Sequence, residues 1–284
     1  PPRSTLFPYT TLFRSGRRPY ELFQEASLPY EWQPKLKEIA EGLGLVFFSS
    51  PFDLEAVDFL GKMGVELYKV ASPEITDIPL IEHIARRGKP IIFSTGLADI
   101  SDIDLAITVS KNNGNEQLAF LKCTSQYPAK ISDANLLTIP DMLNRFGCTV
   151  GVSDHSMGSI VPVVSVSLGA KIVEKHFILD RSLGGVDSAF SMEPKEFEQM
   201  VKDVRDAESS LGVVDYTVSE KDKLRRRSIF AVADISEGEI FSNNNIRSIR
   251  PGYGLHPKLF ENIIGKRAKC SIAKGTPIVD DLIR

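Results

Sequence analysis

Several short apolar runs in this chain end in side chains that could carry out acid–base, anion-binding or metal chemistry. The run from Val150 ends in Ser153, Asp154 and His155, and the run from Lys171 ends in Glu174, Lys175 and His176. Two imidazoles with carboxylates nearby suit a divalent metal ion that keeps open positions for a substrate. Four earlier runs end in lysines, hydroxyls and an acid: Ser49 and Ser50; Lys69, Ser72 and Glu74; Ser94 and Thr95; Lys122, Thr124, Ser125 and Tyr127. Lysines and hydroxyls gathered at one mouth suit a phosphorylated or otherwise anionic ligand.

Each of these residues also has an ordinary structural explanation when it is taken alone. A single histidine in an apolar run is more often a hydrogen-bonded core group, and a single strand-end lysine is more often structural. We expect Cys123 to be a packed core thiol, because nothing beside it in the sequence would lower its pKa. We assign no role to His83 or His256. The repetition of the pattern favours a functional site, since a core strand has no physical use for Glu-Lys-His.

The spacing of the runs predicts the scaffold that must bring their ends together. The runs begin near Leu45, Leu67, Pro90, Leu118, Thr149 and Lys171, which are 22 to 31 residues apart. Helix start signals lie between them at Asp53, Asp77 and Ser101, and a further helical pattern covers residues 31–43. Runs that are apolar throughout suit parallel strands covered on both faces. This alternation of strand and helix predicts a parallel α/β fold.

Two parallel architectures compete, a doubly wound open sheet and a (β/α)8 TIM barrel. No run is followed by a G-x-G-x-x-G turn, which disfavours a dinucleotide-binding sheet. Reactive groups end every run, whereas an open sheet concentrates its site at one switch point. The sequence therefore predicts a barrel, and an incomplete one. About six of the eight strand–helix units can be counted, so we expect two more units to belong upstream of Gly16.

The chain divides into four parts by composition and pattern. Residues 1–15 keep no helix or strand period and look like the translated remnant of a sequencing adapter, so we treat them as non-native. Residues 16–212 form the partial barrel domain, and residues 213–227 form a polar linker. In residues 228–284, the segment 234–247 aligns without gaps with 271–284. This repeat of short strand, glycine turn and short strand predicts a small all-β module, too small to host catalysis alone.

The overall composition excludes several functional classes. A net charge of -3 gives no reason to expect nucleic acid, and the run Arg225–Arg227 is too short for a polybasic arm. The three cysteines show no C-x-x-C spacing and cannot all pair, which indicates reduced thiols in a cytoplasmic protein. No apolar run reaches the roughly 18 residues of a membrane span.

Five strand-end motifs resemble those of the sialic-acid (nonulosonic acid) synthase family: Lys69–Ser72, Ser94–Gly96, Cys123–Pro128, Gly151–His155 and Glu174–Phe177. The segment Arg250–Gly254 resembles the C-terminal antifreeze-like module of that family, the SAF domain with its β-clip fold. The similarity covers nearly everything from about Gly16 to Arg284. It implies a TIM-barrel transferase that condenses phosphoenolpyruvate with an open-chain amino-sugar aldehyde, with C–O cleavage and release of phosphate.

Within this family, the chain is more similar to the pseudaminic acid branch than to the N-acetylneuraminate branch. The segments that carry this similarity are Tyr20–Ala26, Glu31–Trp32 and Arg181–Ser191. The acceptor of that branch is the acetamido sugar 2,4-diacetamido-2,4,6-trideoxy-L-altrose. N-acetylneuraminate and legionaminic acid synthesis stay open as alternatives.

The resemblance also implies roles for single residues. His155 and His176 match the metal-binding histidines, which usually hold Mn²⁺ or Mg²⁺. Positions around phosphoenolpyruvate are matched by Ser50, Lys69, Ser72, Ser125, Ser153 and Tyr127, and acidic positions near the acceptor sugar by Glu74, Glu174 and Asp187. Among these we expect the catalytic groups to be Glu174, Asp187, Tyr127 and Glu74. Arg250 matches a substrate-binding arginine that reaches from one subunit's C-terminal module into the other's barrel, which implies a domain-swapped homodimer.

The sequence departs from the family pattern at its N-terminal end. The family's first two strands carry an Ala-Glu-Ile-Gly-like stretch with a catalytic glutamate and a Lys-x-Gln stretch whose lysine grips phosphoenolpyruvate, and neither occurs in this chain. We therefore expect the polypeptide to turn over poorly. Two further classes stay open: a carbohydrate-binding or protein-binding module that works through the C-terminal β domain, and an inactive fragment.

Overall fold

The computed structural model describes residues 27–185 and 187–284, and the chain divides into two compact units, one ending at Gly212 and the other beginning at Val213. Residues 1–15 and the segment Tyr20–Ala26 lie outside the described residues. The predicted helical pattern over residues 31–43 corresponds to the short η2 (Tyr30–Trp32) and α2 (Gln33–Gly42).

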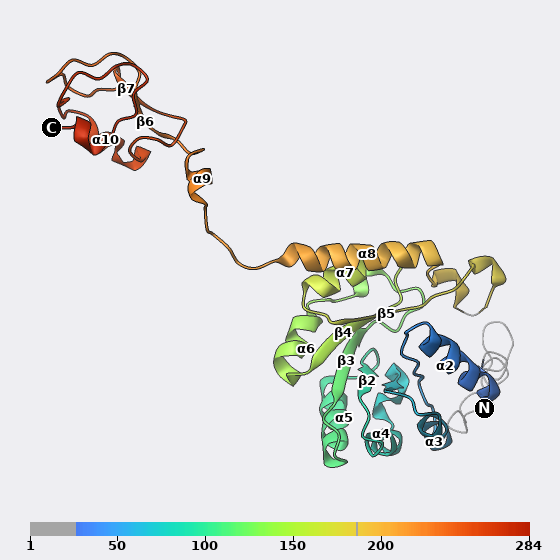
Figure 1. The fold of residues 1–284 in the computed structure, drawn as a ribbon. Coiled ribbons are helices and arrows are strands. Elements are labelled where there is room, and N and C mark those ends of the chain that lie inside the picture. The colour runs from blue at the N-terminus through green and yellow to red at the C-terminus, as the bar shows by residue number, and fades with distance from the viewer. Residues whose placement is uncertain (1–26, 186) are drawn as a thin grey trace. The chain divides into compact units, whose positions relative to one another are not determined.

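The first unit contains one curved parallel sheet whose strands are neighbours in chain order: β1 (Tyr68–Val70), β2 (Ile91–Ser94), β3 (Leu118–Cys123), β4 (Thr149–Asp154) and β5 (Ile172–Lys175). Helices lie outside the sheet (Figure 1): α3 (Leu54–Met63), α4 (Ile78–Ala85), α5 (Ile100–Asn112), α6 (Thr138–Phe146), α7 (Ile160–Ser167) and α8 (Pro194–Leu211). Short 3-10 turns follow the strand ends: η3 (Ser72–Thr76), η4 (Ile131–Asp133), η5 (Arg181–Leu183) and η6 (Ser188–Phe190). The predicted barrel architecture is confirmed as a half-barrel of five strands.

The first predicted strand, which was to begin near Leu45, is not a strand. Residues 45–50 are extended, and the Ser49 carbonyl accepts a single backbone hydrogen bond from the Lys69 amide, at 3.3 Å. The side chains of Leu45 and Val46 are 60% and 57% exposed. A strand needs a repeated ladder of hydrogen bonds, and one bond to β1 does not make one. The count of six units was therefore one too many for the described residues.

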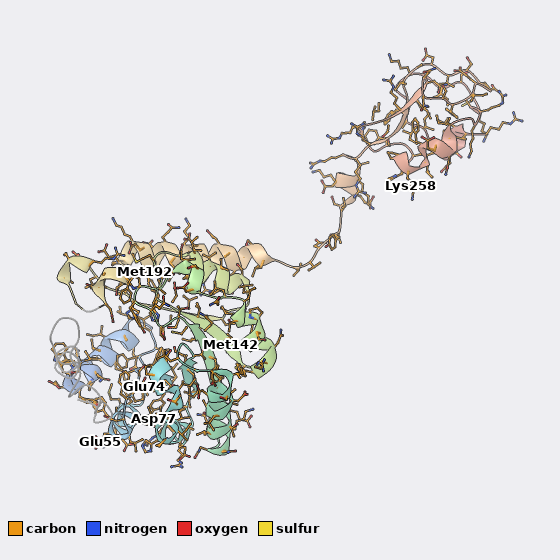
Figure 2. The ribbon with its side chains drawn as sticks, turned by 180° about the vertical axis from the view of Figure 1, so that it is seen from behind. Glu55, Glu74, Asp77, Met142, Met192 and Lys258 are labelled. Atoms are coloured by element: carbon orange, nitrogen blue, oxygen red, sulfur yellow. The ribbon has the colours of Figure 1, made fainter. Side chains whose placement is uncertain are left out.

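Aspartate side chains begin three of the helices, as their short hydrogen-bonding side chains favour. Asp53 and Asp77 each accept a bond from the backbone amide three residues further on, as predicted for α3 and α4; Figure 2 labels Asp77. The predicted start at Ser101 was two residues late. Asp99 caps α5 instead, and the Asp102 carboxylate accepts a bond from the Asp99 amide at 3.0 Å, which completes a capping box.

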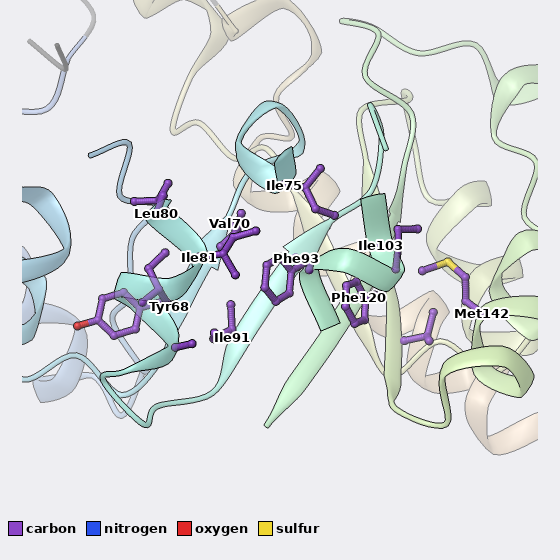
Figure 3. Close-up of a cluster of buried hydrophobic side chains, with 14 of the residues drawn as sticks. Tyr68, Val70, Ile75, Leu80, Ile81, Ile91, Phe93, Ile103, Phe120 and Met142 are labelled. Carbon is purple, nitrogen blue, oxygen red and sulfur yellow. The ribbon is translucent and has the colours of Figure 1, made fainter. Parts of the chain in front are cut away.

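The hydrophobic core of the first unit lies between the sheet and its helices. Figure 3 shows a cluster of buried apolar side chains to which the strands and the helices both contribute. The strands contribute Tyr68, Phe93 and Phe120, and helices α4 and α5 contribute Ile81 and Ile103. The rings of Phe93 and Phe120 stack with centroids 5.2 Å apart. Side chains alternate between the two faces of a strand. The positions between these core residues therefore face the inner side of the half-barrel.

The second unit is a small β module, and the repeat predicted from its sequence is visible in its pairing. The antiparallel strands β6 (Ser228–Ala231) and β7 (Ile246–Ile249) pair, and the equivalent residues Ile235 and Ile272 form a bridge with each other. The equivalent Gly238 and Gly275 both take positive φ, 75° and 89°, where a turn needs glycine. The unit's remaining elements are α9 (Glu220–Lys223), η7 (Pro257–Leu259), α10 (Phe260–Ile263) and η8 (Asp280–Leu282).

Residues 213–227, predicted as a linker, are exposed throughout. None of the helices in residues 27–185 and 187–284 combines the length and the apolar character needed to cross a bilayer.

Candidate active site

The inner face of the half-barrel carries a row of polar side chains at the carboxyl ends of its strands. These are Lys69, Ser94, Cys123, Ser153 and Glu174, each at an alternate position from a core residue. The strand register sets Cys123 opposite Ser153, and Ser153 opposite Glu174. Because the strands are parallel, their carboxyl ends bring residues from five separate runs together, as the repeated run endings predicted. We call this row of five side chains the rim.

Lys69 places a buried ammonium group at the centre of this rim. Its Nζ donates to Ser94 Oγ at 2.7 Å and lies 3.6 Å from Glu174 Oε2. Glu174 accepts a second bond from Ser153 Oγ, at 2.6 Å. Burial lowers the pKa of Lys69, and the neighbouring Glu174 carboxylate opposes that effect. A partly desolvated ammonium beside a carboxylate is a strong site for an anionic ligand that also needs proton handling.

Small groups form a floor beside Lys69. The Gly96 amide donates to Ser72 Oγ at 3.0 Å, and Ser125 Oγ lies 3.7 Å from Cys123 Sγ. A Cβ on Gly96 would stand 2.2 Å from Ser125 Oγ and 2.9 Å from Cys123 Sγ, so any other residue would push these two side chains aside. Hydroxyls and a bare backbone can approach a phosphate or carboxylate closely.

The two histidines lie side by side at the ends of β4 and β5. Their ring centroids are 5.2 Å apart, and the Tyr127 ring lies 4.3 Å from that of His155. His155 Nδ1 is 2.9 Å from the Thr124 carbonyl, and His176 Nδ1 is 3.7 Å from Asp187 Oδ2. A carbonyl or carboxylate at one ring nitrogen orients the other nitrogen as a metal ligand.

This donor set fits a divalent cation such as Mn²⁺ or Mg²⁺ that takes two imidazole nitrogens and leaves its other positions to water and substrate. Across the residues that the structure describes, no group of three or more His, Cys, Asp or Glu side chains comes together that could hold a metal ion. The histidine pair therefore supplies only part of a coordination shell.

Burial and neighbouring groups shift the pKa values of both rings and of Tyr127. Burial alone would lower the pKa of His155, but hydrogen bonds with the Cys123 thiol and the Thr124 carbonyl raise it above its ordinary value. Burial lowers the pKa of His176, while the Asp187 carboxylate partly offsets that effect. The pKa of Tyr127 is raised, first by burial and then by the negative charges around it.

The expectation that nothing lowers the pKa of Cys123 was wrong. The thiol is buried, as expected, and burial raises its pKa. Hydrogen bonds from His155, Ser72 and Ser125 outweigh that effect and bring the pKa to about 7. These partners come from other strand ends and from the residue two positions on, so a reading of immediate sequence neighbours missed them.

Glu74 lies on η3, directly after β1, and is labelled in Figure 2. Its Oε2 is buried without a hydrogen-bond partner. Burial raises the pKa of Glu74, and the Asp77 carboxylate raises it further, while Lys69 lowers it. A carboxyl group that holds its proton more readily than usual is suited to general acid–base work.

Two of the strand-end lysines do not join the rim, contrary to the prediction. Lys122 stands opposite Val152, and Lys175 stands opposite Asp154, on the face of the sheet that packs against helices. Lys122 Nζ donates to Thr124 Oγ1 at 2.7 Å, and Lys175 pairs with Asp154 at 2.5 Å. The alternation along a strand explains this outcome, because both lysines are in phase with core residues.

Two predicted residues, Ser50 and Arg250, do not come from the ends of the five strands. Ser50 follows Ser49, whose carbonyl accepts the Lys69 amide, and so lies beside β1. Arg250 follows β7 in the second unit and is exposed.

The model of the NeuB family matches residues 8–216, and that of the SAF domain matches residues 226–284. The chain belongs to the NeuB family. Pseudaminic acid synthase from Helicobacter pylori is 42% identical over 270 residues, covering 93% of this chain and 79% of that protein. N,N'-diacetyllegionaminic acid synthase from Legionella pneumophila is 37% identical over 268 residues, covering 92% and 75%. The crystal structure of spore coat polysaccharide biosynthesis protein SpsE from Bacillus subtilis matches with a TM-score of 0.64 and 35% identity, covering 93% of this chain and 80% of that one.

Both parts of the resemblance drawn from the sequence, to the NeuB synthases and to the SAF domain, are thereby confirmed. The structure places Ser94 and Gly96 in the site, two residues that the sequence marked as a run end and as part of a family motif without giving either a role. Their signal was present, since Ser-Thr-Gly follows an apolar run at the same place where Lys69 and Ser153 follow theirs.

Described residues of one segment that is similar to the pseudaminic acid branch, Arg181–Ser191, lie beside His176. Arg181 Nε donates to the Ser191 carbonyl at 3.0 Å and closes the loop. Phe190 lies 5.0 Å from the His176 ring. Phe190 also helps to line a cavity of about 340 Å³, together with Met157, Met192 and Met200.

Proposed function

We propose that this chain is a pseudaminic acid synthase, a transferase that condenses phosphoenolpyruvate with 2,4-diacetamido-2,4,6-trideoxy-L-altrose in the cytoplasm. The observation that carries the proposal is the buried Lys69 ammonium, which shares one rim with the Ser72 and Ser125 hydroxyls and with two adjacent imidazoles. The pseudaminic acid synthase of H. pylori, at 42% identity, supports this choice of substrates.

The side chains divide the work between the two substrates. Lys69 and the hydroxyls of Ser72, Ser125 and Ser153 hold the phosphate and carboxylate of phosphoenolpyruvate, which fixes its reactive carbon toward the acceptor. A divalent cation, Mn²⁺ or Mg²⁺, held by His155 and His176 would polarise the acceptor aldehyde as a Lewis acid.

Proton transfer falls to the groups around the acceptor. The methylene carbon C3 of phosphoenolpyruvate forms the new C–C bond to the aldehyde carbon, and the aldehyde oxygen gains a proton. Water adds to C2, the carbon that bears the phosphate, and gives up a proton; phosphate then leaves with cleavage of its bond to C2. Glu174, Asp187, Tyr127 and Glu74 surround the path of those protons. The raised pKa of Glu74 suits it to hold a proton until the reaction needs it.

Binding of phosphoenolpyruvate tests the proposal most directly. Titration calorimetry with Mn²⁺ present should show binding that Lys69→Met weakens by at least about tenfold, because the charge-assisted contact of a buried ammonium is worth roughly 1.5–3 kcal/mol. Lys122→Met is the matched control, since it removes an equally buried strand-end lysine from the opposite face. Equal losses in the two variants would contradict the assignment of the anion site.

The acceptor is tested by comparing, under the same conditions, the precursor sugars of pseudaminic acid, legionaminic acid and N-acetylneuraminate. Release of phosphate and product should be fastest with the pseudaminic precursor. A faster reaction with the legionaminic precursor would favour the second candidate, which the 37% identical Legionella synthase supports. A chain that binds no phosphoenolpyruvate, while residues 226–284 alone bind an acetamido sugar, would support the binding-module alternative.

We further propose that Arg250 acts in the barrel of a second copy within a swapped homodimer. Mixing Arg250→Ala protein with Lys69→Met protein then restores some activity, because one mixed site has both residues intact. No recovery on mixing, with both variants dimeric by light scattering, would rule out an exchange of modules between copies.

A further inference from the structure

A buried ion pair joins the ends of β4 and β5 behind the two histidines. Lys175 Nζ lies 2.5 Å from Asp154 Oδ2, and the two side chains are only 2% and 3% exposed. The residues are direct partners in the parallel register. Asp154 precedes His155, and Lys175 precedes His176, so the pair lies one residue from each ring on the opposite face of the sheet.

Two further bonds extend this pair to the far side of His155. Asp154 Oδ1 accepts the Ser156 amide at 2.8 Å, and Lys175 Nζ also donates to the Ser156 carbonyl. Lys175, the residue before His176, is thus bonded both to the side chain of the residue before His155 and to the backbone of the residue after it. Neither strand end can shift or rotate without breaking a buried charge-assisted bond.

Stability alone does not account for such a pair. Desolvation of two charges offsets most of their attraction, and apolar replacements of buried pairs are often neutral or stabilising. What an apolar pair cannot supply is a fixed geometry, because it lacks directional bonds. Precise placement is what two ligands of one ion need.

We infer that Lys175 and Asp154 are positioning residues, which hold the His155 and His176 rings at the separation needed to share one cation. The inference rests on the proposed function for the role of the rings. The separation itself is a property of the metal-free chain and can be measured without the ion.

The decisive measurement is the nuclear Overhauser cross-peak between the two imidazoles in the full chain, with histidine labelled and metal absent. Ring centroids 5.2 Å apart place their protons close enough to give one. Lys175→Met should weaken or abolish it, and Lys175→Arg, which keeps the charge, should restore it. Leu80→Ala is the control for lost stability, because Leu80 is fully buried on α4 away from the rim.

Mn²⁺ binding to the same proteins, followed by the electron paramagnetic resonance of free Mn²⁺, provides the second measurement. Lys175→Met should raise the dissociation constant about 10- to 100-fold, the usual effect of losing a residue that orients metal ligands. Leu80→Ala should leave it unchanged. If Lys175→Met does not fold, Asp154→Asn takes its place, since an amide keeps a bond to Ser156.

The outcomes separate the positioning role of Lys175 and Asp154 from the assignment of the two histidines as metal ligands. A folded Lys175→Met protein that keeps the cross-peak overturns the positioning role. The positioning role is also overturned if Lys175→Met weakens the cross-peak no more than Leu80→Ala does. If the unmodified chain shows the cross-peak yet binds no Mn²⁺, the metal assignment fails and the positioning inference is still decided by the cross-peak.

Discussion

The face of the strand on which a residue lies decides whether it can meet a substrate. Lys69 lies between the core residues Tyr68 and Val70 and so points to the rim, whereas Lys122 and Lys175 are in phase with the core. The sequence was sufficient to find the residue types at the rim. The two-residue period of a strand, applied at each strand end, separates Lys69 from the other two lysines.

At the same scale, Gly96→Ala should damage the anion floor while the fold persists. The new Cβ would stand 2.2 Å from Ser125 Oγ and 3.0 Å from Ser72 Oγ, so both hydroxyls must move. Loss of one such contact costs roughly 1–3 kcal/mol, which is about 5- to 150-fold in phosphoenolpyruvate affinity. Calorimetry gives the affinity, and thermal unfolding checks the fold. Unchanged affinity would show that the floor does not touch the ligand.

Elements could be predicted from the sequence where their signals are local. Asp53 and Asp77 begin helices through bonds to amides three residues away, so the sequence reveals them. The run at Leu45 has the composition of a strand, but a ladder depends on a partner far along the chain. The lowered pKa of Cys123 likewise depends on His155, a contact made only when β3 and β4 pair.

The approach of β4 to β5 depends on Gly151. A Cβ there would stand 2.4 Å from the Ile172 carbonyl oxygen and 2.6 Å from Leu121 Cδ2, atoms that the sheet holds in place. Gly151→Ala should therefore lower the free energy of unfolding by about 1–3 kcal/mol, the usual cost of overpacking. Gly42→Ala at the end of α2 is the control, because nothing lies within 4 Å of its Cβ. Urea unfolding measures both, and equal stabilities would contradict the close approach.

A charged cluster joins α3 to α4 and gives the fold a pH dependence. Asp58 Oδ1 lies 2.6 Å from His83 Nε2 and also pairs with Arg87. The hydrogen bond with His83 holds the pKa of Asp58 below its ordinary value of 3.8 against the opposing effect of burial, and the charge of Arg87 adds a smaller lowering. A lowered folded-state pKa contributes stability above pH 3.8 that is lost as the pH falls through the folded value.

The stability advantage over Asp58→Asn should therefore be present at pH 5 and vanish as the pH drops below the folded pKa of Asp58. Urea unfolding at a series of pH values measures the difference. Asp104→Asn, on the exposed side of α5, serves as the matched control. A difference that stays constant down to pH 2 would show that the cluster does not depend on the charge of Asp58.

The whole molecule consists of two units, each with a core of its own. The second unit buries its own apolar cluster: Ile229, Ala231, Ile235, Phe241, Ile246, Ile263, Ala268, Ile272 and Ile278. The sequence showed this division through a change from strand–helix alternation to a glycine-marked repeat. It could not show how the repeats pair, because the bridge between Ile235 and Ile272 joins residues far apart in the chain.

Separate cores should give separate unfolding transitions. Phe241→Ala removes a fully buried ring from the second unit and should destabilise that unit by about 3–5 kcal/mol. The transition of the first unit should not move, and Gly151→Ala should show the reverse. Differential scanning calorimetry resolves the two. A single transition that both substitutions shift equally would contradict two independent cores.

The ion pair behind the histidines also restricts how the sequence can drift over evolutionary time. A neutral residue at position 154 or 175 alone leaves a charge stranded in the interior, so one replacement is tolerated only when its counterpart changes in the same lineage. Across homologous chains, these two positions should consequently show correlated substitution or none at all.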